Sequence, residues 1–183
     1  MKGRTLLQRI AVAAGLAGLL FSVAAPAQVP QEQVAKARIL FNFARFVEWP
    51  EAAFRNGNQL MLCLLAGTDP VGTALEPLKG KVVAGHTIEL RRLKAGDPLK
   101  ACHILFVSDS EKRRLDAIIA EVRGAPVLLV SEIDNFLELG GMIQLVALDN
   151  RVQFEINLGA ATKGGLTVSS KLLKVAASVI GGR

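Results

Sequence analysis

Three short apolar segments restrict the fold more than any other feature of this chain. They are residues 60–65, 103–107 and 127–130, and none contains a charged residue. Each has the length of a strand without polar alternation, which is typical of strands covered on both faces. Stretches with helical character, at 70–78 and 111–123, separate them. The pattern predicts a mostly parallel sheet with helices on both faces.

The region before the first strand predicts a long, mostly buried helix over residues 31–49, which Pro50 ends by restricting Trp49. One helical face is apolar and consists of Val34, Ala37, Leu40, Phe41, Ala44 and Val47, widened by Ile39, Phe43 and Phe46. A narrow polar stripe remains, formed by Arg38, Asn42 and Arg45. Solvation explains such a stripe; a secondary protein-binding patch is the alternative.

The C-terminal part of the chain predicts antiparallel strands in place of parallel ones. Residues 142–148 and 151–157 flank Asp149-Asn150, a two-residue turn typical of a hairpin because both residues tolerate positive φ. The expected fold is therefore an α/β domain whose mixed, mostly parallel sheet ends in an antiparallel hairpin. A final helix is expected after Ser169 or Ser170, either of which would cap it. Its apolar stripe would consist of Leu172, Leu173, Ala176, Val179 and Ile180.

The N-terminus has the anatomy of a cleaved secretory signal peptide. Lys2, Arg4 and Arg9 precede an apolar run, and Ala25-Pro26-Ala27 supplies a small-x-small cleavage site. The run of about 15 residues is shorter than the roughly 20 that cross a bilayer. We expect cleavage after Ala27, a single domain over residues 28–183, and a location in the periplasm.

Net charge gives no support to nucleic-acid binding. Without the three basic residues of the leader, the 22 Lys and Arg fall to 19 against 16 Asp and Glu, so the formal charge falls from +6 to +3. A nucleic-acid site should bring a basic stripe or an aromatic platform. Here Tyr is absent and the basic residues are scattered, so no nucleic-acid partner is expected.

The number of cysteines fits a location in the oxidising periplasm. Cys63 and Cys102 lie 39 residues apart, and an even count in an oxidising compartment favours a disulfide over reactive thiols. Two buried free thiols, acting as small apolar side chains, are the alternative.

Catalytic and cofactor motifs find no support. A hydrolase would need a nucleophile with a base in reach, and the only histidines, His86 and His103, sit in no recognisable motif. Residues 67–72 fit neither phosphate-binding glycine pattern. His103 beside Cys102 is too little for a metal site. We expect no enzyme activity, no cofactor and no metal.

The second hairpin strand offers a candidate binding face. Val152, Phe154 and Ile156 alternate with Arg151, Gln153, Glu155 and Asn157, so one face is core and the other polar. Arg and carboxylate groups on a rigid strand can set the specificity of a protein interface. We therefore take these four polar residues as the candidate partner surface, with plain solvation as the rival interpretation.

Three segments together resemble the YfiR-like family of periplasmic regulatory proteins. They are residues 36–50 (KARILFNFARFVEWP), the hairpin region 141–158 and residues 165–173 (GLTVSSKLL). The resemblance spans nearly all of the expected mature chain. It implies an α/β sandwich that often dimerises, and a bridge between Cys63 and Cys102 like that of relatives. A second cysteine pair found in some members is missing here.

The resemblance also implies a function. It suggests a non-catalytic protein that holds a membrane-anchored diguanylate cyclase inactive by binding its periplasmic region, and so lowers cyclic di-GMP signalling. A peptidoglycan-associated outer-membrane lipoprotein can sequester such a repressor, and other membrane sensors are alternative partners. A periplasmic small-molecule receptor is the second hypothesis, and it requires an apolar pocket with a few polar groups.

Overall fold

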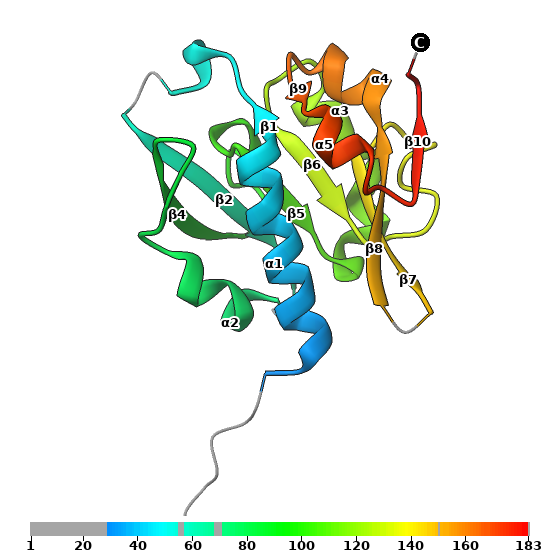
Figure 1. Ribbon diagram of the computed structural model, residues 1–183, viewed down its shortest axis with the longest axis horizontal. Coiled ribbons are helices and arrows are strands. Elements are labelled where there is room, and N and C mark those ends of the chain that lie inside the picture. Colours follow the sequence, from blue (N-terminus) through cyan, green and yellow to red (C-terminus); the bar gives the residue numbers. More distant parts are fainter. Residues whose placement is uncertain (1–28, 55–56, 68–70, 150, 183) are drawn as a thin grey trace, which may run out of the picture.

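A computed structural model describes residues 29–54, 57–67, 71–149 and 151–182 (Figure 1). The expected leader, residues 1–27, and Asn150 of the predicted turn lie outside the described residues. Within those residues the strands form an eight-stranded sheet, in the order β10-β8-β7-β6-β5-β2-β4-β3, and a separate two-stranded ladder, β1-β9.

The centre of the large sheet is parallel. It consists of β2 (Gln59–Leu65), β4 (His86–Leu93), β5 (Ile104–Val107) and β6 (Leu128–Ser131), with β2 between β4 and β5. Every residue of β5 and β6 is buried. The three apolar segments are thus confirmed as covered strands, because helices on both sides exclude water from them.

Both margins of the sheet add antiparallel pairing. On one side β3 (Val82–Val83) pairs with β4. On the other, β7 (Ile143–Leu148) continues the parallel order beside β6 and then forms the predicted hairpin with β8 (Arg151–Asn157). Asp149, at the turn, has a φ of 50°, the positive value that such a turn requires. The expected mixed α/β fold is confirmed.

Helices cover the two faces of the sheet (Figure 1). The long α1 (Gln31–Phe46) crosses one face, near the short α2 (Gly72–Leu75) and α5 (Ser170–Leu173), and α3 (Leu115–Val122) lies behind the sheet. The remaining helical pieces are α4 (Leu158–Lys163) and four 3-10 turns: η1 (Glu51–Phe54), η2 (Glu76–Leu78), η3 (Leu99–Ala101) and η4 (Asp109–Arg114).

The apolar side of α1 forms the centre of one core layer. Leu40, Phe43 and Ala44 are fully buried, and the ring of Phe43 meets that of Phe154 edge to face at 5.2 Å. Val34, which was expected in this face, is 41% exposed near the helix start. The face is therefore confirmed over the C-terminal part of the helix, which lies over the sheet.

The first helix is shorter than predicted. It ends at Phe46, and residues 47–48 form β1 (Val47–Glu48), which pairs antiparallel with β9 (Thr167–Val168). Val47 still points into the core, so its apolar character fits either structure. The backbone leaves the helix because a strand distant in sequence provides hydrogen bonds for it, a partner that helical periodicity does not reveal.

The predicted final helix is wrong beyond its first turn. Ser169 does cap α5, its Oγ accepting a hydrogen bond from Lys171 N, but α5 ends at Leu173. The chain then forms β10 (Ser178–Ile180), a parallel neighbour of β8. Val179 and Ile180 are each 40% exposed because they lie on a sheet edge. The backbone of β10 forms hydrogen bonds with the open edge of β8. At the end of a short helix, the same groups would be left to solvent.

The helix predicted over residues 111–123 begins differently from the expectation. Its first part is η4, capped by Ser108, whose hydroxyl accepts from Ser110 N. The α-helical part, α3, buries Leu115, Ile118, Ile119 and Val122, the apolar side expected from the sequence.

Candidate protein-binding surface

The polar face of β8 lies on the opposite side of the sheet from α1. Phe154 packs against Phe43 of α1, and side chains alternate along a strand. Arg151, Gln153 and Glu155 therefore point to the face that α1 does not cover. Arg151 is exposed and the other two are half-buried. The alternation expected for β8 is confirmed, since Phe154 and Ile156 are buried.

Asn157, the fourth residue of this face, is engaged in the fold itself. Its Nδ2 donates to Leu137 O at 3.1 Å, and its Oδ1 accepts from Ala160 N at 2.9 Å, which caps α4. Both ends of the amide therefore have intramolecular partners. The side chain fixes the loop before β7 to the end of β8, so we assign it a structural role.

The strand β7 adds two apolar side chains that the sequence interpretation left out. In the hairpin register, Val146 lies opposite Gln153 and Leu148 lies opposite Arg151, and directly opposite residues share a face. Leu148 is 49% exposed. An exposed apolar side chain beside charged and amide groups is a composition common in protein interfaces. We call Val146, Leu148, Arg151, Gln153 and Glu155 the hairpin face.

Within the sequence there was a signal for these two residues. Gln144, Val146 and Leu148 alternate in step with the second strand, and the two-residue turn sets the register. Applying the alternation to both strands of the hairpin would have placed Val146 and Leu148 on the same face as Gln153.

The second candidate patch does not join the first. Arg38 and Arg45 are exposed and Asn42 is half-buried on the outer side of α1. Since α1 covers the other face of the sheet, this stripe and the hairpin face point in opposite directions. Arg45 lies over the ring of Phe46, with Cζ 5.4 Å from the ring centroid. The two patches would have to serve different contacts.

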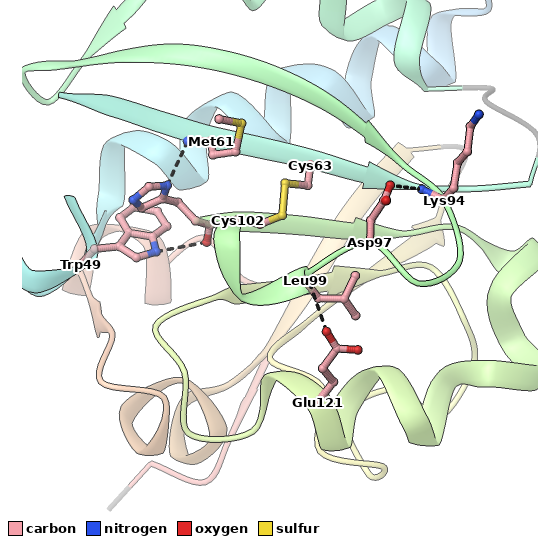
Figure 2. Close-up of a disulfide and its surroundings, with 9 residues drawn as sticks. Trp49, Met61, Cys63, Lys94, Asp97, Leu99, Cys102 and Glu121 are labelled. Carbon is pink, nitrogen blue, oxygen red and sulfur yellow. Dashed lines mark hydrogen bonds between the residues drawn. A yellow bond between two sulfur atoms is a disulfide. The ribbon is translucent and has the colours of Figure 1, made fainter. Parts of the chain in front are cut away.

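The two cysteines form a disulfide, as the even count favoured (Figure 2). It joins Cys63 in β2 to Cys102, two residues before β5 begins, and both residues are buried. The adjacent strands are thereby crosslinked at the centre of the sheet. The free-thiol alternative is excluded.

The two histidines meet at one aromatic ring. Phe54 stacks on His86 with ring centroids 3.7 Å apart and on His103 at 4.5 Å. The two histidines therefore lie close together, both in contact with the same phenylalanine ring. In addition, Trp49 Nε1 donates to His103 O (Figure 2).

The hydrogen bonds of His103 leave its ring without a nitrogen for proton transfer. Nδ1 accepts from Met61 N at 3.0 Å, so Nε2 carries the proton and donates to Ala53 O at 3.1 Å. Burial lowers the pKa of His103 below 6.5, the bond to Ala53 opposes this, and the nearby His86 lowers it further. His103 is a neutral structural connector between β5, β2 and η1.

Near the start of α1, a buried lysine bridges two carboxylates. Lys36 Nζ lies 2.6 Å from Glu32 Oε1 and also bonds Glu132 Oε2, in the loop after β6. Burial alone would lower the pKa of Lys36, but the hydrogen bonds and negative charges of Glu132 and Glu32 raise it above 10.5. The charged lysine thus ties α1 to the end of β6.

A cavity of about 870 Å³ lies between α3, α4 and the C-terminal segment. Apolar side chains, including Ile119, Val122 and Met142, and several glycines form much of its wall. Arg123 and Lys163 also line it, and both are exposed. Such a volume suits a small organic molecule, and the two cations would favour an anionic one.

The described residues hold neither a metal-binding cluster nor a membrane-spanning helix. In this part of the chain, no group of three or more His, Cys, Asp or Glu side chains is placed to hold a metal ion. Among the same residues, no helix combines the length and the apolar character needed to cross a membrane.

Together these features define a disulfide-bonded α/β domain with a covered sheet centre and an open hairpin. The chain belongs to the YfiR/HmsC-like family, whose model matches residues 33–177. The resemblance noted in the sequence is thereby confirmed. Membership suggests a regulatory role, in the periplasmic control of cyclic di-GMP signalling, rather than a catalytic one.

Two solved structures are similar at low sequence identity. One is a conserved domain protein from Vibrio cholerae O1 biovar El Tor, with 14% identity and a TM-score of 0.48. The other is the ABC domain in complex with L-Trp from Streptococcus pneumoniae, with 13% identity and a TM-score of 0.46. In both cases the match covers 67% of this chain and 55% of the other, so this chain spans just over half their length.

Proposed function

We propose that this protein is a periplasmic regulator that binds the external region of a membrane-anchored diguanylate cyclase and represses it. The observation that carries the proposal is membership of the YfiR/HmsC-like family over residues 33–177. An outer-membrane, peptidoglycan-associated lipoprotein would compete for the protein and relieve repression. Like other members, the protein would act as a homodimer.

Several features support a binding role. Both ring nitrogens of His103 are used within the fold, and the disulfide leaves no thiolate at Cys63 or Cys102. The hairpin of β7 and β8 instead presents the hairpin face, which mixes apolar and charged groups. A rigid face of this kind recognises a surface without needing a reactive group.

Binding alone is enough to repress an enzyme. A regulator that prefers the inactive conformation of the cyclase shifts the population toward that conformation, and the shift is limited by the difference between its two affinities. Inhibition then rises with occupancy, and release restores the active state.

We propose that the hairpin face carries the contact. Arg151, Gln153 and Glu155 set specificity, and Leu148 contributes apolar area at the centre of the contact. Arg38, Asn42 and Arg45 form a second contact surface, on the other side of the molecule, which leaves room for a further copy or for the lipoprotein.

The test begins with a partner search. The mature protein, immobilised, is incubated with a detergent extract of the inner membrane, and retained proteins are identified by mass spectrometry. We expect a protein with a periplasmic region and a cytoplasmic diguanylate cyclase domain. Retention of no membrane protein, or only of proteins unrelated to signalling, would contradict the proposal.

Variants then locate the contact. Leu148→Asp and Arg151→Ala should lose the cyclase from the bound fraction and raise cellular cyclic di-GMP. Glu138→Ala, another exposed change in the loop before β7, should behave as wild type. If the hairpin variants repress normally, the hairpin face is not the contact.

A second candidate function is a receptor for a small anionic molecule, which the cavity of about 870 Å³ favours. Its apolar wall would hold the body of the ligand, and Arg123 and Lys163 would hold its negative group. A thermal-shift screen of amino acids, nucleotides and short-chain carboxylates tests it. Stabilisation that disappears in Arg123→Ala/Lys163→Ala supports this receptor; its persistence in that variant, or its absence for every compound, contradicts it.

A further inference from the structure

The side of β7 that faces β6 lacks a neighbouring strand along four of its six residues. The ladder between β6 and β7 consists of two pairs, Val130 with Ile143 and Ser131 with Gln144. After Ser131 the chain turns away from β7 at Glu132, but β7 continues to Leu148. The part of β7 after Gln144 is therefore paired on one side only, with β8.

The hydrogen-bond pattern identifies which backbone groups face this edge. Asn157 N donates to Met142 O, so the pair of residues 142 and 157 is hydrogen-bonded across the hairpin. In an antiparallel ladder such pairs alternate, and the even-numbered residues of β7 bond to β8. The N–H and C=O of Ala147 consequently point to the other side, and Ala147 is exposed. No described strand pairs with it on that side.

A groove of about 460 Å³ runs along this edge. Residues of β7 and Val152 line one side, and α1 and the loop after β6 line the other. The opposite wall carries Glu32, Lys36, Glu132 and Asp134, a formal charge of three carboxylates against one ammonium. Lys36 already shares its charge with Glu32 and Glu132, whereas Asp134 is exposed. The groove is therefore an acidic channel beside an unpaired strand edge.

We propose that this groove binds an extended, basic peptide segment of a partner protein by strand addition to β7. The backbone of the segment would pair with Ala147, and its Lys or Arg side chains would lie against Asp134 and Glu132. Main-chain hydrogen bonds supply affinity in this mode of recognition, and side chains supply specificity. An acidic segment would meet like charge on the opposite wall.

The geometry also sets the length of the segment. The unpaired part of β7 spans four residues, 145–148, and the strand beyond them ends in the hairpin turn. A short peptide in register with these residues fills the edge. This inference deepens the proposed function, since it names the chemistry of the partner segment. It rests on that function only for the identity of the partner protein.

The test uses a short labelled probe on the intact mature protein. An eight-residue peptide of alternating Lys and Val is titrated by fluorescence anisotropy at low ionic strength, and the same peptide with Glu in place of Lys is compared. We expect the basic peptide to bind in the micromolar to millimolar range and the acidic peptide to bind at least about tenfold more weakly.

Two variants of one residue separate strand addition from general attraction. Ala147→Pro removes the N–H that faces the groove and spares the hydrogen bonds to β8, and Ala147→Val keeps that N–H. We expect Ala147→Pro to weaken binding of the basic peptide about tenfold, as the loss of one or two hydrogen bonds would. Ala147→Val should bind within about twofold of wild type. Circular dichroism and thermal melting verify that both variants fold.

A second matched pair tests the charges. Asp134→Lys in the groove should weaken binding, and Glu138→Lys on the same loop outside it should not. Equal binding of Ala147→Pro and Ala147→Val, equal binding of the basic and acidic peptides, or no binding of either peptide at about 1 mM would overturn the proposal. The membrane pull-down keeps the two proposals distinct: peptide binding without a captured cyclase contradicts only the function, and capture that is unchanged in Ala147→Pro contradicts only the groove.

Discussion

The centre of the sheet and its hairpin margin differ in how far their strands are buried and paired. Around β2 and β5, the structure is held by a disulfide, by a buried histidine with both ring nitrogens bonded, and by β5, of which every residue is buried. At β7 and β8, the strands continue beyond their neighbours, and Leu148 is 49% exposed. The difference teaches that one sheet can serve two purposes. Its buried centre stabilises the fold, and its hairpin margin leaves backbone and side chains free to bind a partner.

The largest expected effect comes from removing the disulfide at the centre. Replacing both cysteines, Cys63→Ala/Cys102→Ala, releases a constraint over 39 residues, which the chain-entropy model puts at about 4 kcal/mol of unfolding free energy. Urea denaturation of the wild type and the double variant measures it. A loss below about 1 kcal/mol would mean that the centre is held by packing alone.

The next effect concerns Lys36, which lies between the two regions. Lys36→Met should cost about 1 to 3 kcal/mol of unfolding free energy, because the half-buried Glu132 loses its cation. Lys36→Arg, which keeps the charge, should cost less. Because the pKa of Lys36 is raised above 10.5, its stabilisation is complete below the unfolded pKa and disappears as the pH rises through the folded one. Denaturation curves at neutral and strongly alkaline pH measure both effects.

A smaller effect is expected from His103 on acidification. Its pKa is lowered in the folded state, so its contribution to stability is present above the unfolded pKa of about 6.5 and declines as the pH falls toward the folded one. The melting temperature should fall from about pH 7 to about pH 5. His103→Asn, which retains an acceptor for Met61 N, should flatten this dependence; an unchanged slope would place the sensitive group elsewhere.

The smallest effects on stability are expected at the hairpin. Arg151→Ala and Gln153→Ala should change the unfolding free energy by no more than about 0.5 kcal/mol, since neither side chain is buried. Thermal melts of these variants beside the disulfide variant test the comparison directly. A loss of several kcal/mol would show that the hairpin face supports the fold, and the contrast between the two regions would no longer hold.

Much of the fold was predictable because its signals are local. Continuous apolar runs predicted the buried strands, Asp149 and its neighbour predicted the hairpin, and Ser169 was one of the two expected caps. The errors share a cause: the end of α1 and the strand β10 depend on pairing with β9 and β8, which are distant in sequence. The polar face of β8 was predictable by alternation, whereas the engagement of Asn157 with Leu137 and Ala160 was not.

The sequence by itself determined the class of the fold, the hairpin register and the family, because strand length, side-chain alternation and turn chemistry act over a few residues. Only the tertiary structure decided where β6 stops beside β7, which carboxylates surround Lys36 and that His86 and His103 share one ring. The physical reason is that backbone hydrogen bonds and charges need partners in space. Those partners come from segments far apart in the sequence, and no local sequence pattern shows that these segments come into contact.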